Sequence, residues 1–197
     1  RPAEAADILW AMWPFWFTRG YTVEGRSWYE KTFSLSSPPR AAETRALVGA
    51  ALMCYSQGEL ALARTRLKHA VTVAHDVDDL EVIALAQNLS GRVEHGFGDL
   101  RAARTQFAGS VEKYRSLSFK WGVGSALAGM AGVALTTGDF EEAERLLDEA
   151  ASELQHTGPW FLTLSLNVRA LLAVRRRQPD QAISLVRESV TVLRDLQ

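Results

Sequence analysis

A turn motif that recurs at a constant interval is the feature that most constrains how this chain folds. Gly58-Glu59-Leu60, Gly98-Asp99-Leu100 and Gly138-Asp139-Phe140 are equally spaced, with a period of about 40 residues. Each motif is followed by three positions at offsets of four and three, which share one side of a helix. These stripe positions hold a small, a large apolar and a small residue: Ala63, Leu67 and Ala70; Ala103, Phe107 and Ser110; Ala143, Leu147 and Ala150. A fixed period of this length indicates a repeat protein.

Two weaker copies of the motif flank the three clear ones. After them, Arg177-Gln178-Pro179-Asp180 forms the turn, and the stripe holds Ala182, Val186 and Ser189. Before them, Gly20 opens the turn, and the stripe holds Gly25, Tyr29 and Thr32. The chain therefore contains about five units of nearly equal length.

Each unit is predicted to be two helices joined by the turn. We expect the first helices at 3–19, 42–57, 81–97, 121–137 and 160–176. We expect the second helices at 22–34, 60–75, 100–116, 140–156 and 180–196. One such pair cannot bury its apolar faces alone, whereas stacked pairs can. The predicted fold is all-α: a right-handed α-solenoid of helix–turn–helix repeats of about 40 residues, forming one domain over residues 1–197.

The turn and the stripe resemble the tetratricopeptide repeat (TPR). A small residue seven positions before the turn, where paired helices approach closely, also matches that family: Ala51, Gly91, Ala131 and, in the fourth of these units, Ala170. Two features differ from the family pattern. The period is longer than the usual one of about 34 residues, and the usual proline at the end of the second helix is absent.

The first predicted helix is rich in aromatic residues. Trp10, Trp13 and Phe17 recur at offsets of three and four, as a core stripe does, whereas Phe15 and Trp16 are expected to point elsewhere. One interpretation is a helix packed inside the stack and bent at Pro14. The other is that Phe15 and Trp16 dock on a domain upstream of this chain.

This amino-terminal stretch resembles the start of the helical-repeat region in bacterial transcriptional regulators of the LuxR and AfsR types (MalT-like, STAND ATPases). The matching residues are Leu9-Trp10, Phe15-Trp16, Arg19-Gly20, Glu24-Gly25-Arg26 and Trp28. The resemblance implies a fragment of a larger protein with an ATPase module and a DNA-binding domain in the parent chain. It implies that these repeats sense a ligand or partner and restrain the ATPase, without catalysis of their own.

Composition and motifs exclude several other classes of function. The net charge of -1 gives no field to attract nucleic acid, and the longest apolar run, residues 8–17, is half of what a membrane span needs, about 20 residues.

The single cysteine, Cys54, predicts a buried structural thiol and a reducing, cytoplasmic location. No phosphate loop, zinc spacing, calcium loop or nucleophile motif is present, so we expect no enzyme, cofactor or metal. In the acidic stretch after His75, Asp78 or Asp79 is expected to cap the next helix.

The first helices of a TPR-type stack line its concave face. Counting from the small residue places five polar side chains there: Arg45, Asn88, Arg92, His95 and Asn167. Asparagine at this position grips peptides in relatives that bind them, so the resemblance implies a polar, mildly cationic groove for an extended peptide, a protein partner or a small acidic effector. Two alternatives to the regulator remain open: a freestanding adaptor that binds a peptide there, or the regulatory arm of an enzyme.

The last helix is expected to present an apolar face formed by Ala182, Leu185, Val186, Val190 and Leu193. A solenoid normally closes with a polar cap. The apolar face therefore predicts a following repeat, or a homodimer through this helix.

Overall fold

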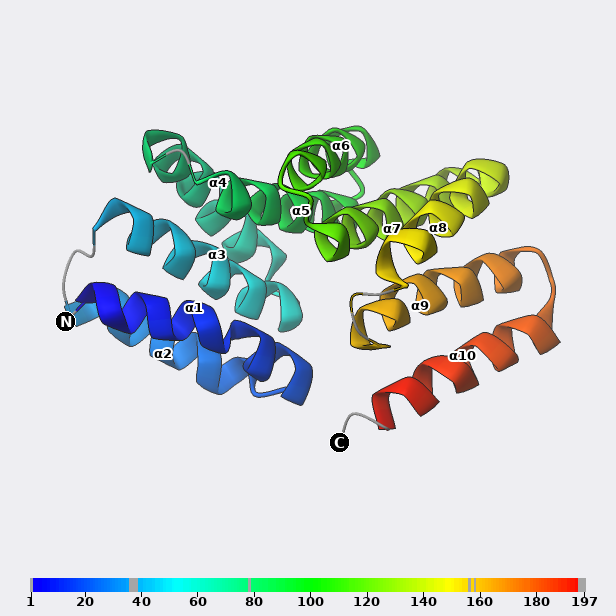
Figure 1. Ribbon diagram of the computed structural model, residues 1–197, viewed down its shortest axis with the longest axis horizontal. Helices are drawn as coiled ribbons and strands as arrows, with labels where there is room; N and C mark the ends of the chain where they lie inside the picture. The colour runs from blue at the N-terminus through cyan, green and yellow to red at the C-terminus, as the bar shows by residue number, and fades with distance from the viewer. Residues whose placement is uncertain (1, 36–38, 78, 156, 158, 195–197) are drawn as a thin grey trace. The chain divides into compact units, whose positions relative to one another are not determined.

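The computed structural model describes residues 2–35, 39–77, 79–155, 157 and 159–194, and these residues form ten α-helices and no strand (Figure 1). The chain divides into two compact units, Arg1–Asp99 and Leu100–Gln197. The helices of the first unit are α1 Pro2–Arg19, α2 Thr22–Leu35, α3 Arg40–Ser56, α4 Leu60–Val77 and α5 Leu80–Phe97. Those of the second are α6 Leu100–Ser116, α7 Lys120–Thr137, α8 Phe140–Leu154, α9 Pro159–Arg175 and α10 Pro179–Arg194. Every predicted helix is present, and its ends agree closely with the expected ones.

Successive hairpins stack inside each unit. In the first, α3 lies on both helices of the α1–α2 hairpin and pairs with α4, while α5 lies against α3 and α4 (Figure 1). In the second, α7 packs on α6 and pairs with α8, and α9 lies on both helices of the α7–α8 hairpin and pairs with α10. A helix of the next repeat thus covers the hairpin before it, as expected for a repeat stack.

Glycine ends the first helix at four of the turns. Gly20, Gly58, Gly98 and Gly138 have φ between 77° and 82°, a conformation that side chains with a Cβ seldom adopt. Arg177 takes the same left-handed conformation, with φ 58°, in the turn whose sequence lacks glycine. The turn geometry therefore persists where its sequence signal is weakest.

Aspartate caps the start of two helices. Asp79 accepts a hydrogen bond from the Val82 N–H (3.2 Å), and Asp139 accepts one from the Glu142 N–H (3.1 Å). These bonds satisfy donors that a helix start leaves unpaired. The cap predicted at Asp78 or Asp79 is Asp79, whereas Asp78 lies outside the described residues.

The stripe positions form the core. All fifteen are buried except one, Val186 on α10, which is 48% exposed. The large central residue of the stripe meets a glycine of the following first helix in both units: Tyr29 lies against Gly49 of α3, and Phe107 lies against Gly129 of α7. We call this central residue the contact position; its members are Tyr29, Leu67, Phe107, Leu147 and Val186. Glycine opposite the aromatic rings lets the helices approach closely.

The aromatic residues of α1 do not divide as expected. Trp16 is only 5% exposed, with its ring edge-on to Tyr29 at 5.8 Å between centroids, so the expectation that it points away from the core is wrong. Trp10, Trp13 and Phe17 are partly buried against the same core. Gly25 leaves room for the Trp16 ring, because a Cβ there would lie 2.8 Å from it. A docking surface on α1 therefore lacks the Trp16 side chain but retains Phe15, which is 45% exposed.

The apolar face expected on the last helix is present in part. Val186, Val190 and Leu193 are 40–48% exposed, whereas Ala182 is buried against the rest of the unit and Leu185 is half-buried. None of the helices formed by the described residues combines the length and hydropathy needed to cross a bilayer.

Candidate functional site

Three of the predicted groove residues form one polar stripe on α5. Asn88, Arg92 and His95 follow one another at offsets of four and three, so they share a face of the helix. Asn88 is 2% exposed, and its Oδ1 accepts a hydrogen bond from the Arg92 Nε at 3.2 Å. Arg92 and His95 are half-buried. The buried Asn88 side chain therefore orients the Arg92 guanidinium. Arg92 and His95 form the more exposed part of the stripe.

Electrostatics gives these two outer residues different charges. Burial, and then the positive charge of Arg92, lowers the pKa of His95 below its ordinary value of 6.5. The imidazole is therefore neutral at pH 7, with one nitrogen to donate and one to accept a hydrogen bond. Arg92 keeps its charge at any physiological pH. The stripe thus presents one fixed cation beside one neutral polar ring.

The opposite side of α5 is tied firmly to α4. Arg64 donates two hydrogen bonds to the carboxylate of Glu94, and its guanidinium lies 3.9 Å from the centre of the Phe97 ring. Bidentate pairing of this kind restricts both side chains. Together with the Asp79 cap and the Gly98 turn, it holds α5 as a fixed support for the polar stripe.

Arg45 does not lie with the stripe. Its guanidinium bridges Asp7 of α1 and Asp79 before α5, each at 3.3 Å. Asp79 precedes α5 and His95 lies in its last turn, so these two positions are about 24 Å apart along the helix at 1.5 Å per residue. Arg45 therefore links three helices at the other end of α5, away from Arg92 and His95, and a ligand-binding role for it stays a prediction.

Asn167 belongs to the second unit. It is exposed on α9, and its Oδ1 accepts a hydrogen bond from the Ser189 hydroxyl of α10 at 3.0 Å. This bond joins the two helices of the last hairpin. A ligand-binding role for Asn167 stays a prediction.

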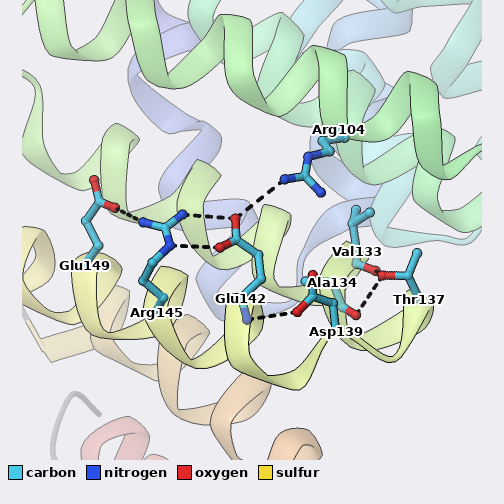
Figure 2. A network of polar contacts seen from close by, with 8 residues as sticks. All are labelled: Arg104, Val133, Ala134, Thr137, Asp139, Glu142, Arg145 and Glu149. Carbon is cyan, nitrogen blue, oxygen red and sulfur yellow. Dashed lines mark hydrogen bonds and ion pairs between the residues drawn. The ribbon is translucent and has the colours of Figure 1, made fainter.

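A network of charged side chains joins α6 to α8 in the second unit (Figure 2). Arg145 donates two hydrogen bonds to Glu142, at 2.8 and 3.0 Å, and lies 3.3 Å from Glu149. Arg104 of α6 lies 3.5 Å from Glu142, and Arg115 of α6 pairs with Glu149. The hydrogen bonds from Arg145 hold the pKa of Glu142 below its ordinary value. The carboxylates of Glu142 and Glu149 are thus ion-paired with arginines of both helices and connect α6 to α8.

A hollow of about 590 Å³ lies beside this network, between α6, α7 and α8. Its lining includes Ala108 and Leu146. The corresponding positions in the first unit, by the repeat spacing, are Glu30 and Arg66, whose side chains pair with each other. The two arginines at the edge of the hollow, Arg115 and Arg145, both pair with glutamate. The hollow thus has an apolar floor and two paired arginines at its edge, and Glu112 adds a carboxylate to its lining.

Sequence reasoning placed Phe15 on an exposed surface of α1 but missed Ile8 and Met12, which extend that surface. Ile8, Met12 and Phe15 are 63%, 36% and 45% exposed, and Phe15 contacts Tyr21 with ring centroids 5.7 Å apart. Their offsets of four and three place these three residues on one side of the helix. This pattern is hard to recognise in the sequence because most residues of the segment are apolar. Among the described residues, no group of three or more His, Cys, Asp or Glu side chains is placed to hold a metal ion.

Solved structures similar to this chain share its fold. The crystal structure of BtubC (BKLC) from P. vanneervenii aligns with 100% of this chain and 82% of its own, with a TM-score of 0.71 and 13% identity. A putative kinesin light chain from Podosopora anserina, with nearly identical TPR-like repeats, aligns over 100% and 98%, with a TM-score of 0.64 and 14% identity. MamA aligns over 96% and 92%, with a TM-score of 0.55 and 15% identity. No protein-family model and no curated protein matches the chain. At these identities the likeness shows the fold alone, an all-α solenoid of TPR-like helical repeats.

Proposed function

We propose that this chain is a non-catalytic protein-interaction segment that binds an extended peptide with a free carboxylate at the polar stripe of α5. The observation that carries this proposal is the pairing of a buried Asn88 with Arg92 on a helix fixed at both ends. A guanidinium oriented in advance loses less freedom when it pairs with a carboxylate. TPR-like folds generally mediate protein–protein interaction, which supports the same conclusion.

Each group of the stripe has a distinct part in this binding. Arg92 supplies the charge that selects a carboxylate, and the neutral imidazole of His95 exchanges a hydrogen bond with the peptide backbone. Asn88 acts as a positioning residue, because it reaches Arg92 but is too buried to touch a ligand directly. A small acidic effector offers the same carboxylate chemistry but lacks the backbone for His95.

The test is a peptide screen with matched variants. Arrays of peptides with a free carboxyl terminus are compared with the same peptides amidated at that end. We expect the amide to abolish binding and Arg92→Gln to weaken it 10- to 100-fold, since a hydrogen bond to a charged group contributes about 1.5–3 kcal/mol. Lys68→Gln, which removes an exposed charge from α4, is the matched control and should bind as the wild type does. Unchanged affinity in the Arg92 variant would refute the proposal.

The proposed setting is a cytoplasmic regulator of the LuxR type, in which these repeats are the sensing arm. The support is the amino-terminal signature around Trp10, Phe15-Trp16 and Trp28. A ligand on the stripe biases an attached ATPase only if it binds one state of the protein better than the other. Sequencing the reading frame on both sides of Arg1 and Gln197 tests this setting. A phosphate loop upstream together with a helix-turn-helix segment at either end supports it, whereas their absence favours a freestanding adaptor, and a catalytic domain there favours the arm of an enzyme.

A further inference from the structure

The exposed apolar stripe on α1 occupies positions that are buried in the next repeat. Aligning the turn glycines of the two repeats, Gly20 and Gly58, relates four residues of α1 to four of α3: Ile8, Ala11, Met12 and Phe15 to Ala46, Gly49, Ala50 and Met53. All four residues on α3 are buried, whereas all four on α1 are exposed. On α3, Gly49 lies against Tyr29 of α2, and the Met53 sulfur approaches Gly25 of α2. The α1 stripe is therefore the face with which a first helix packs on a preceding hairpin.

A second exposed apolar stripe lies on the α9–α10 hairpin. It corresponds to the other half of such a contact, the hairpin surface on which a following first helix packs. Val174 of α9 and Val186 and Leu193 of α10 are 58%, 48% and 40% exposed. Aligning the left-handed turn residues Gly138 and Arg177 relates them to three buried residues of the α7–α8 hairpin, which are 7%, 0% and 1% exposed: Leu135, Leu147 and Leu154. That hairpin is covered by α9, which contacts both of its helices. The α9–α10 hairpin thus presents a surface of the kind that a following first helix covers.

The two surfaces match at the contact position. In two repeats an aromatic residue at the contact position packs against a glycine of the next first helix: Tyr29 meets Gly49, and Phe107 meets Gly129. Val186 is the one exposed member of the contact positions. Ala11 of α1 corresponds to Gly49 and is also small. Val186 placed against Ala11 would likewise pair a larger side chain with a smaller one.

We propose that copies of this chain associate head to tail, with the α1 stripe of one copy seated on the α9–α10 surface of another and Ala11 against Val186. The occupant is a second copy because the chain carries both halves of the contact that its own repeats make internally. The two surfaces differ, so the contact is heterologous and each added copy leaves both end surfaces open. Association should therefore continue with concentration rather than stop at a dimer.

Two variants that each block one end provide the test, by sedimentation in an analytical ultracentrifuge. Ala11→Glu blocks the α1 stripe and Val186→Glu blocks the α9–α10 surface, because an unpaired charge is costly to bury in an apolar contact. Both positions are exposed, and far-UV circular dichroism checks that the helices persist. Val23→Glu, at a 72% exposed valine outside both stripes, is the matched control.

We expect the mass of the wild type and of Val23→Glu to rise with concentration beyond that of a dimer, and each end variant to stay monomeric. Mixing the two end variants should then give a 1:1 dimer, because one retains a free α1 stripe and the other a free α9–α10 surface. A wild type that stays monomeric throughout would overturn the proposal. A dimer of Ala11→Glu alone would also overturn it, in favour of a symmetric dimer through α10.

Discussion

Gly49 of α3 lies against the ring of Tyr29, and its replacement by alanine tests how tightly successive hairpins pack. An alanine Cβ at this position would lie 2.2 Å from the Tyr29 hydroxyl oxygen and 2.3 Å from its Cζ. Tyr29 has no room to withdraw, because it is fully buried and its hydroxyl donates a hydrogen bond to the Leu9 carbonyl at 2.9 Å. The substitution must therefore move the ring or separate α3 from α2.

The expected effect is a net loss of stability. In an open helix, Gly→Ala stabilises by about 1 kcal/mol. At Gly49, overpacking costs about 1–3 kcal/mol and the loss of the Tyr29 hydrogen bond about 1 kcal/mol, so the free energy of unfolding should fall by about 1–3 kcal/mol. Gly96→Ala is the matched control, because its Cβ meets only the tip of the flexible Leu60 side chain, and it should be neutral or slightly stabilising.

Urea denaturation followed by tryptophan fluorescence measures this difference. Four of the six tryptophans lie in the first unit, so the signal reports mainly on it: Trp10, Trp13, Trp16 and Trp28. In a Tyr29→Leu background, which copies the smaller contact residue of the next repeat, Gly49→Ala should cost at least about 1 kcal/mol less. If Gly49→Ala proves as harmless as Gly96→Ala, the close contact between α2 and α3 is refuted.

Three further predictions concern a helix cap, a histidine and the cysteine. Asp139→Ala should lower the free energy of unfolding by about 1 kcal/mol because it removes the bond to the Glu142 N–H, and Asp139→Asn should retain most of it; equal losses would contradict the cap. His95 has a lowered pKa, so below pH 6.5 the unfolded chain binds a proton more readily than the folded chain, and stability falls as pH falls. His95→Gln should reduce this fall in the free energy of unfolding, measured by denaturation above and below pH 6.5. A variant that loses as much stability as the wild type between the two pH values would contradict the contribution of His95. Burial raises the pKa of the Cys54 thiol, so a thiol reagent should modify it only after denaturant is added, and rapid modification of the folded protein would contradict its placement.

The helices were readable from the sequence because their signals are local. Gly98 and Gly138 allow the left-handed residue that ends a helix, and Asp79 and Asp139 supply oxygens to the first free N–H groups. Both effects involve residues within a few positions of one another. The repeat added a second source of information, since Arg177 could be recognised as a turn only from its place in the period.

The candidate site was predicted less well, because it depends on which side chains neighbouring helices bury. Asn88, Arg92 and His95 share a helix face, and helical periodicity alone is enough to group them. The depth of Asn88 and the bridging of Asp7 and Asp79 by Arg45 depend on helices distant in the sequence. Contacts with distant helices cannot be predicted from the spacing of residues along one helix.

The sequence by itself determined the period, the turns and the alternation of first and second helices, since these follow from backbone preferences within each unit. Tertiary structure decided which of the many apolar residues are covered. Trp16 and Phe15 are neighbours in one apolar segment, yet packing against Tyr29 buries the first and leaves the second exposed. Val186 has the same place in its repeat as the buried Leu147, but only the latter has a following helix on it in the structure. Burial depends on what lies next to a residue in space, so the repeat pattern predicts the surfaces that can be covered and only the fold shows which ones are.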